Sequence, residues 1–196
     1  MLSTSRSQFH NPRICNSSAA PVASSSASTT FSTNILARDV RLIHLKIVSV
    51  GKGNSPGAVL MAEEWAEKVR RYTTLTEVQI KPNPKKTTNV EIQKQAEGEK
   101  VLKAVDARDW IVLLDERGRS MKSEDMAQLI GKAGDRGSPV VFCIGGPFGH
   151  SDAVRERANE SIRLSDMVLN HQVAHVVLLE QVYRGWTILR GEPYHH

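Results

Sequence analysis

The sequence predicts an α/β protein with a mostly parallel sheet that is covered by helices on both faces. From Asp39 onward, apolar β-branched segments alternate with amphipathic helical segments. Strands that are separated by helices run parallel, because the helix carries the chain back across the sheet. Ligands of such sheets bind beyond the carboxyl ends of the strands, so the loops after Asp115, Ile144 and Leu169 are the expected binding region.

The expected strands are short apolar runs rich in Val, Ile and Leu. They are Leu42–Val50, Glu77–Ile80, Trp110–Asp115, Pro139–Ile144 and Leu164–Leu169. Between the second of these strands and the next helix, Lys81–Asn89 is expected to be a basic loop broken by prolines.

The expected helices are amphipathic. The first covers Ala58–Tyr72, with an apolar stripe of Leu60, Met61, Trp65, Ala66 and Val69. Val90–Ala107 is the second. Ser123 is expected to cap the third, which carries acidic residues in its first turn and stops near Gly134–Gly137. Ser151 or Asp152 caps a fourth, and Val173–Leu189 is the last, followed by the tail Gly191–His196.

Residues 1–38 have the composition of an organelle transit peptide. They are rich in Ser, Thr and Ala, they contain Arg6, Arg13 and Arg38, and the first acidic residue of the chain is Asp39. No continuous apolar segment of a secretory signal is present. We therefore expect a transit peptide at 1–38 and one domain at 39–196. The serine content favours the chloroplast, with the mitochondrion as the alternative.

Composition limits the remaining function classes. No apolar run approaches the roughly 18 residues that cross a membrane. Cys15 and Cys143 are too few for a disulfide framework or a cysteine zinc site. Without the three arginines of the first segment, residues 39–196 carry 23 basic against 21 acidic residues. This balance permits nucleic-acid binding but does not require it.

Two glycine-rich segments follow predicted strands. Gly51–Gly57 has the spacing G-x-G-x-x-x-G, and the next strand ends in Ile80-Lys81 without the acid that would hold a ribose. A dinucleotide site is therefore disfavoured against a simple turn. Gly145-Gly146-Pro147-Phe148-Gly149 directly follows a buried strand, where glycines let the backbone approach a ligand. A tight strand-to-helix turn explains the same residues equally well.

The last helix carries the other polar candidates. His171 and His175 are four residues apart, but Gln172 breaks the metalloprotease pattern, so a structural or RNA contact is favoured over a metal site. Glu180 and Arg184 can form an i, i+4 ion pair, and Arg184 can alternatively contact a phosphate. No nucleophile–base arrangement can be identified, which fits an already activated donor that the protein mainly positions.

Residues from about Leu42 to His196 resemble the ribosomal large-subunit RNA methyltransferase H family, pseudouridine N3-methyltransferases of the SPOUT superfamily. The resemblance rests on six segments in the family's order. These are Val48–Lys52, Leu113-Leu114-Asp115 with Gly118, Ile144–Gly149, Leu164–His171, Glu180–Arg184 and Arg190–His195. Asn170 and His175 depart from it, since the family has proline and arginine at these positions.

The resemblance implies a C-terminal trefoil knot, a homodimer and S-adenosylmethionine as the methyl donor. It places the donor at Leu114, at Gly145 with Gly146, and at Leu164, Ser165, Asp166, Met167, Val168 and Leu169. The implied substrate is a pseudouridine of large-subunit rRNA, with Arg184, Tyr194 and His195 as candidate RNA contacts. His195 and Glu180 are the candidates for accepting the N3 proton. No metal and no membrane are expected.

Two other functions remain open on the sequence. One is a ribosome-assembly factor with the same fold that has lost donor binding, against which the intact Gly145-Gly146 argues. The other is a nucleotide-dependent oxidoreductase. The apolar positions of the last helix (Val176, Val177, Leu179, Val182, Tyr183 and Trp186) are more than a narrow core stripe needs, so part of that helix is expected at a dimer interface.

Overall fold

The computed structural model describes residues 41–82 and 89–193. The strands are β1 (His44–Val50), β2 (Thr74–Ile80), β3 (Trp110–Ser120), β4 (Val140–Ile144) and β5 (Glu160–Arg163). The helices are α1 (Pro56–Arg70), α2 (Val90–Lys103), α3 (Ser123–Arg136), α4 (Asp152–Arg157) and α5 (His171–Arg190).

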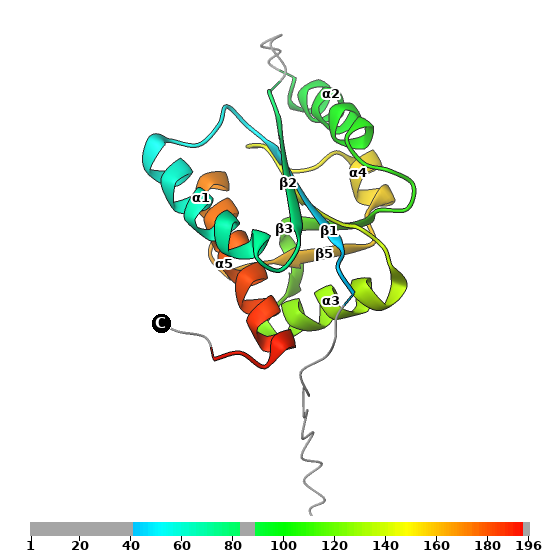
Figure 1. Ribbon diagram of the computed structural model, residues 1–196. Coiled ribbons are helices and arrows are strands. Elements are labelled where there is room, and N and C mark those ends of the chain that lie inside the picture. The colour runs from blue at the N-terminus through cyan, green and yellow to red at the C-terminus, as the bar shows by residue number, and fades with distance from the viewer. Residues whose placement is uncertain (1–40, 83–88, 194–196) are drawn as a thin grey trace, which may run out of the picture. The chain divides into compact units, whose positions relative to one another are not determined.

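The five strands form one sheet in the order β2-β1-β4-β3-β5 (Figure 1). All four neighbouring pairs are parallel, which confirms the predicted sheet type. The β3–β5 register shifts between Leu114 and Arg119, because residues 115–118 bulge out of the ladder. Because these strands are parallel, the carboxyl ends of β1, β3 and β4 lie at the same edge of the sheet. The trefoil knot stays a prediction, since strand order alone does not establish how the chain threads.

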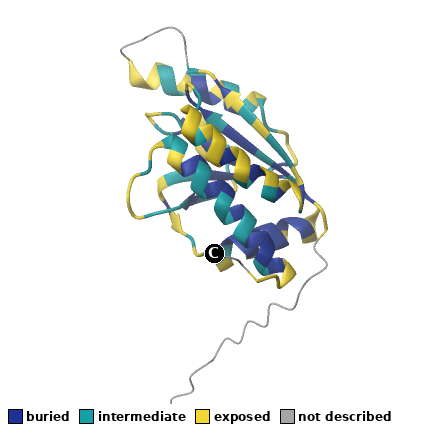
Figure 2. Ribbon diagram, turned by 60° about the vertical axis from the view of Figure 1, so that its left-hand side comes forward, coloured by how far each residue is buried: buried dark blue, intermediate teal, exposed yellow. Residues whose placement is uncertain are grey.

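Helices cover both faces of the sheet, as predicted. Val48, Ile111 and Cys143 face α2 and α4 in one apolar cluster. The opposite face carries a larger cluster under α1, α3 and α5. Figure 2 shows buried residues along the strands and exposed residues on the outer sides of the helices. Within the described residues, no helix is long and apolar enough to cross a membrane.

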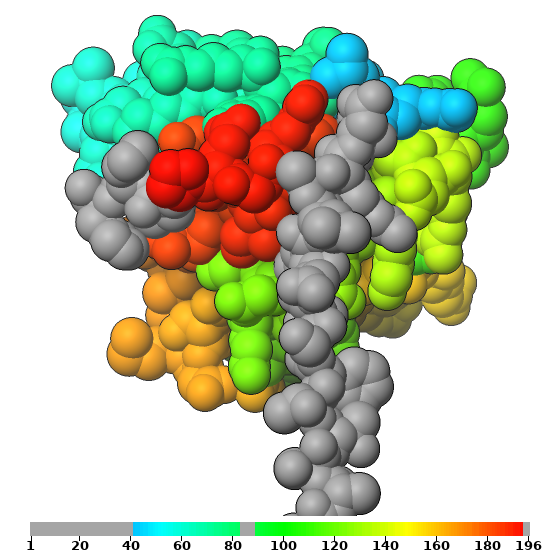
Figure 3. Space-filling view, turned by 60° about the horizontal axis from the view of Figure 1, so that its bottom comes forward, coloured from blue at the N-terminus to red at the C-terminus, as the bar shows by residue number. Residues whose placement is uncertain are grey.

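The last helix, α5, packs between α1 and α3. Most of its apolar residues are buried in the core of the single chain. Leu179, Val182 and Trp186 are 0–1% exposed within the single chain. These three residues therefore belong to the core of the single chain. The expectation that part of the apolar surface of α5 meets a partner stays a prediction for the half-buried Val176, Val177 and Tyr183. The C-terminal turns of α5, drawn red in Figure 3, reach the surface beside α1.

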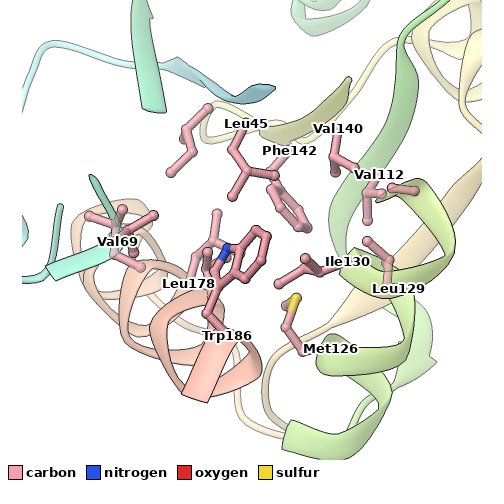
Figure 4. Close-up of a cluster of buried hydrophobic side chains, with 14 of the residues drawn as sticks. Leu45, Val69, Val112, Met126, Leu129, Ile130, Val140, Phe142, Leu178 and Trp186 are labelled. Carbon is pink, nitrogen blue, oxygen red and sulfur yellow. The ribbon is translucent and has the colours of Figure 1, made fainter. Parts of the chain in front are cut away.

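The larger core cluster fixes the three helices against the sheet (Figure 4). The Trp186 ring packs among Phe142, Ile130 and Met126, all at most 2% exposed. Gly185 permits this approach, because a Cβ there would lie 3.1 Å from Ile130 Cδ1.

Three sequence expectations are corrected. Leu164–Leu169 is a loop, and the edge strand is Glu160–Arg163, in which only Ile162 is buried and the apolar signal is weak. Ser123 does not cap α3: Lys122 is the N-cap residue and its backbone N–H donates to Asp125 Oδ2 at 2.9 Å.

The third correction concerns α1. Its buried positions are Ala62, Ala66 and Val69, whereas Leu60 and Met61 are 74% and 55% exposed. The helix therefore faces the core with small residues and leaves larger apolar residues outside. The basic loop expected at Lys81–Asn89 lies mostly outside the described residues.

Candidate functional site

A cavity of about 620 Å³ opens at the carboxyl ends of the strands. It is lined by residues 114–117, 144–149 and 163–171 apart from Asp166, together with Arg155 and Ala174. They belong to the bulge within β3, to the loops after β4 and β5, and to the start of α5. The loop expected after Asp115 is thus a bulge, because β3 continues to Ser120. The structure thus brings together every donor-binding candidate except Asp166, whose side chain is 85% exposed and pairs with Arg163 at 2.8 Å.

The glycine loop after β4 is a tight turn that also forms a wall of the cavity. The Gly149 N–H donates to the Gly146 carbonyl at 2.9 Å, and Gly149 has a φ of +75°. A Cβ at Gly145 would lie 3.1 Å from the Gly149 carbonyl carbon. The structure therefore confirms the tight turn. The turn also leaves bare backbone facing the cavity, and its contact with a ligand stays a prediction.

Asp115 and Arg155 form an ion pair of 2.5 Å in the cavity wall. The Asp115 side chain is only 5% exposed. Burial would raise its pKa, but the Arg117 N–H bond and the charge of Arg155 outweigh burial and hold the pKa below its usual value. The carboxylate therefore stays ionised. No local sequence signal predicts this pair, because its partners are 40 positions apart.

His150 braces the same wall from inside the protein. It is 3% exposed, and its Nε2 lies 3.1 Å from the Leu114 carbonyl oxygen. Burial lowers the pKa of His150, although the hydrogen bond to Leu114 and the charge of Asp115 act in the opposite direction. The imidazole is therefore neutral at pH 7 and acts as a structural link between the ends of β3 and β4.

The loop after β5 presents apolar side chains to the cavity, and the last residue of β5 adds one buried donor. Met167 and Val168 are 74% and 78% exposed, and Phe148 on the facing loop is 43% exposed. Arg163 Nε is buried without a hydrogen-bond partner in the described part of the chain. Apolar walls with a few polar groups are typical of a nucleoside-type cofactor site. The residues present therefore fit S-adenosylmethionine.

The N-terminus of α5 closes one side of the cavity. Asn170 caps the helix by accepting from the Gln172 N–H at 2.9 Å, so this departure from the family pattern preserves the helix start. His171 lines the cavity, whereas His175 is buried and lies 2.9 Å from Glu77 Oε2 and 3.0 Å from the Asn54 amide. His175 therefore has a structural role.

The first glycine segment lies outside the cavity lining. The Ser55 N–H donates to Gln172 Oε1 at 2.8 Å, which ties this loop to α5. The predicted preference for a simple turn over a dinucleotide site agrees with this arrangement. In the described residues, no group of three or more His, Cys, Asp or Glu side chains could hold a metal ion.

Glu180 and Arg184 form the expected ion pair at 2.9 Å and do not line the cavity. Glu180 lies nine residues along α5 from His171, a rise of about 13 Å. Tyr194 and His195 lie outside the described residues. Their expected place at the mouth of the site therefore stays a prediction.

Comparisons with known proteins agree with this geometry. The family described as "Predicted SPOUT methyltransferase" matches residues 43–195. A predicted RNA methyltransferase of Arabidopsis thaliana is 47% identical over 158 residues, 80% of this chain and 82% of its own. Ribosomal RNA large subunit methyltransferase H of Geobacter sp. (strain M21) is 41% identical over 155 residues, 79% of this chain and 99% of its own.

Among solved structures, the SpoU methyltransferase AviRb from Streptomyces viridochromogenes, in complex with AdoMet, gives a TM-score of 0.41 at 17% identity. The match covers 74% of this chain and 58% of that one. The family model and the sequence relatives together decide the assignment and confirm the predicted enzyme class and methyl donor. The chain belongs to the SPOUT methyltransferases, which use S-adenosylmethionine, and within them to the ribosomal RNA large subunit methyltransferase H family.

Proposed function

We propose that this chain transfers a methyl group from S-adenosylmethionine to N3 of a pseudouridine in large-subunit rRNA of an organelle. The observation that carries the proposal is the cavity at the carboxyl ends of the strands, where a bare glycine turn, apolar side chains and the buried Arg163 Nε converge. The names of the sequence relatives support the class of RNA.

The chain's own residues bind and orient in this scheme. Leu114, Gly145 and Gly146 offer backbone groups to the donor from one side, and Leu164–Leu169 close over it from the other. The apolar side chains among them exclude water. Bound S-adenosylmethionine supplies an already activated methyl group, so the protein needs to align it with N3 rather than form a covalent intermediate. The N3 proton must leave as the methyl arrives, and His195 stays the candidate acceptor because Glu180 lies outside the cavity.

A homodimer is part of the proposal. Apolar side chains left exposed in the single chain gather on α1 and at the start of α5 and the loop before it: Val59, Leu60, Met61, Val173, Met167 and Val168. A twofold partner covering them would also border the cavity, because Met167 and Val168 line it. Leu60→Glu should shift the chain toward monomer in light scattering; a stable, active wild-type monomer at micromolar concentration would contradict the dimer.

Residues 1–38 complete the proposal as a transit peptide, with the chloroplast as destination and the mitochondrion as the alternative. Their composition supports it. A fluorescent reporter fused to this segment should enter the organelle, and a reporter that stays in the cytosol would refute the targeting.

Calorimetric titration with S-adenosylmethionine tests the donor site. Gly145→Val should weaken binding at least tenfold, about 1.4 kcal/mol, because the new side chain would press on the Gly149 backbone and reshape the cavity wall. Gly57→Val is the matched control, since a Cβ at Gly57 has no heavy atom within 4 Å and α1 lies outside the cavity lining.

Equal affinity in Gly145→Val and wild type would refute the site. No binding by the wild-type chain would favour the non-catalytic assembly factor, and binding of a dinucleotide instead would favour the oxidoreductase.

A further inference from the structure

Glu97 is a buried carboxyl group on the face of α2 that packs against the sheet and α4. It is 3% exposed. Its Oε1 accepts a hydrogen bond of 3.0 Å from the Gln93 side-chain amide. Its Oε2 is buried and has no hydrogen-bond partner within residues 41–82 and 89–193. A buried carboxylate oxygen without a partner is costly to keep in a folded protein, so its presence calls for an explanation.

The unpartnered Glu97 Oε2 lies next to the glycine turn after β4. A Cβ at Gly146 would lie 3.0 Å from Glu97 Oε2 and 3.2 Å from Val50 Cγ1. Gly146 also lines the cavity. Only the backbone of Gly146, which carries no side chain, therefore lies between the carboxyl group of Glu97 and the cavity.

Four charged groups of the cavity region are already paired, whereas Glu116 and Arg117 in the cavity lining are exposed to solvent. Asp115 is bound by Arg155 at 2.5 Å, and Arg163 is bound by Asp166 at 2.8 Å. No ion pair of 4.0 Å or less joins Glu97 to a cation in the described part of the chain. An ionised Glu97 would therefore leave an uncompensated negative charge behind the glycine turn, in surroundings where water screens it weakly.

We propose that Glu97 makes the cavity prefer a cationic methyl donor over its neutral product. The inference rests on the proposed donor site. In the reaction the methyl carbon bonds to N3, the electron pair of the broken carbon–sulfur bond stays on sulfur, and the N3 proton leaves to a base or to water. The sulfonium becomes a neutral thioether, so the attraction to Glu97 is lost once the methyl has moved. Glu97 thus favours donor binding and product release.

Three ligands separate charge from shape. S-adenosylmethionine carries the sulfonium. S-adenosylhomocysteine lacks both the methyl group and the sulfonium charge, and sinefungin carries an ammonium group in place of the sulfonium. In calorimetric titrations of Glu97→Gln, affinity for the two cationic ligands should fall about tenfold, while affinity for S-adenosylhomocysteine should change less than twofold.

Glu99→Gln is the matched control, because Glu99 lies two residues further on the same helix, is exposed, and its replacement removes the same charge. It should leave all three affinities unchanged. Glu97→Met is the second neutral variant and should fold even if Glu97→Gln does not, since apolar replacement of a buried charge is usually tolerated.

Equal loss of affinity for all three ligands, or no loss for any, would overturn the role of Glu97. A loss confined to S-adenosylmethionine would overturn it too, since it would indicate contact with the methyl group rather than charge. Failure of the wild-type chain to bind S-adenosylmethionine would instead refute the proposed function itself.

Discussion

The two ends of α5 lie in different surroundings. At its N-terminus, His171 and Ala174 line the cavity, and the adjoining loop leaves Met167 and Val168 exposed. The buried Arg163 Nε and His171 Nε2 have no hydrogen-bond partner there among the described residues.

The C-terminal end of the helix is closed by aromatic packing and satisfied polar groups. Tyr72 stacks on Trp186 with ring centroids 5.9 Å apart and an interplanar angle of 11°, and its hydroxyl donates to Glu192 Oε2. Gly191 ends the helix with a φ of +65°. Among the buried side-chain nitrogens and oxygens of the described residues, only the indole Nε1 of Trp186 lacks a hydrogen-bond partner at this end of the helix.

This difference separates stability from binding along one helix. Buried polar groups are normally paired, so unpaired ones together with exposed apolar side chains indicate a surface that a ligand or partner completes. We therefore expect substitutions at the C-terminal end to lower the free energy of unfolding and substitutions at the N-terminal end to lower donor affinity.

The largest expected effect is on the free energy of unfolding, at the C-terminal end of α5. Trp186→Ala should lower the free energy of unfolding by about 3–5 kcal/mol, because it empties a fully buried site. Met167→Ala should change it by less than about 0.5 kcal/mol but weaken S-adenosylmethionine binding. Urea unfolding and calorimetry measure the two quantities. A Met167 variant that is destabilised without losing affinity would remove the distinction between the two ends.

Deleting residues 194–196 should come next in size. Glu192 stays to accept from Tyr72, so folding and S-adenosylmethionine binding should be nearly unchanged. Methyl transfer to ribosomal particles should fall at least about a hundredfold if the tail supplies one positioned catalytic group. Unimpaired transfer would exclude the tail from the reaction, and loss of donor binding would make it structural.

A mixing experiment shows which copy supplies the tail. If the tail of one subunit acts at the cavity of the other, heterodimers of tail-deleted chains and Gly145→Val chains should recover activity, because the intact cavity of one subunit would meet the intact tail of the other. No recovery in verified heterodimers would contradict a tail that acts across the dimer.

Arg155→Ala should have a smaller effect, lowering the free energy of unfolding by about 1–2 kcal/mol. It leaves Asp115 buried without its cation, but Arg155 is itself 38% exposed, so water replaces part of the interaction. Arg108→Ala, at an exposed position, should cost less than about 0.5 kcal/mol in the same urea titration. Equal stability of the two variants would show that the ion pair does not brace the cavity wall.

His150 should give the smallest effect, visible only in the pH dependence. Its pKa is lowered in the folded chain by burial, so the unfolded chain binds more protons as pH falls below about 6.5 and stability declines toward the folded-state pKa. Above that range the contribution is fully present. His150→Gln should therefore lose less stability than wild type between pH 7.5 and 5.5. The Asp115 contribution is lost only below about pH 4 and does not overlap. Identical slopes would contradict a buried neutral His150.

Much of the fold follows from local sequence. The strands β1 and β4 are apolar runs that are predicted as buried strands, and the Gly137 turn ends α3 as predicted. The apolar part of β3 is predicted too, but the strand continues past Asp115 to Ser120 through mostly exposed residues. β5 was misplaced because it lies at the sheet edge and pairs with only one neighbour, so Ile162 alone carries its apolar signal.

The site was predictable only in part. Parallel topology alone selects the loops that line the cavity. The Asp115–Arg155 pair, His150 and Glu97 were missed because their importance depends on contacts between segments far apart in the chain. The place of Tyr194 and His195 stays a prediction, because both lie outside the described residues.

The most direct test of the central claim is mass spectrometry of rRNA after reaction. Large-subunit particles that lack the modification are incubated with the full chain and S-adenosylmethionine carrying a deuterated methyl group, and the rRNA is digested to nucleosides. We expect the label on N3 of a pseudouridine, at a level that Gly145→Val reduces and Gly57→Val does not. Unlabelled rRNA with a chain that binds the donor, or label on another base, would contradict the proposed reaction.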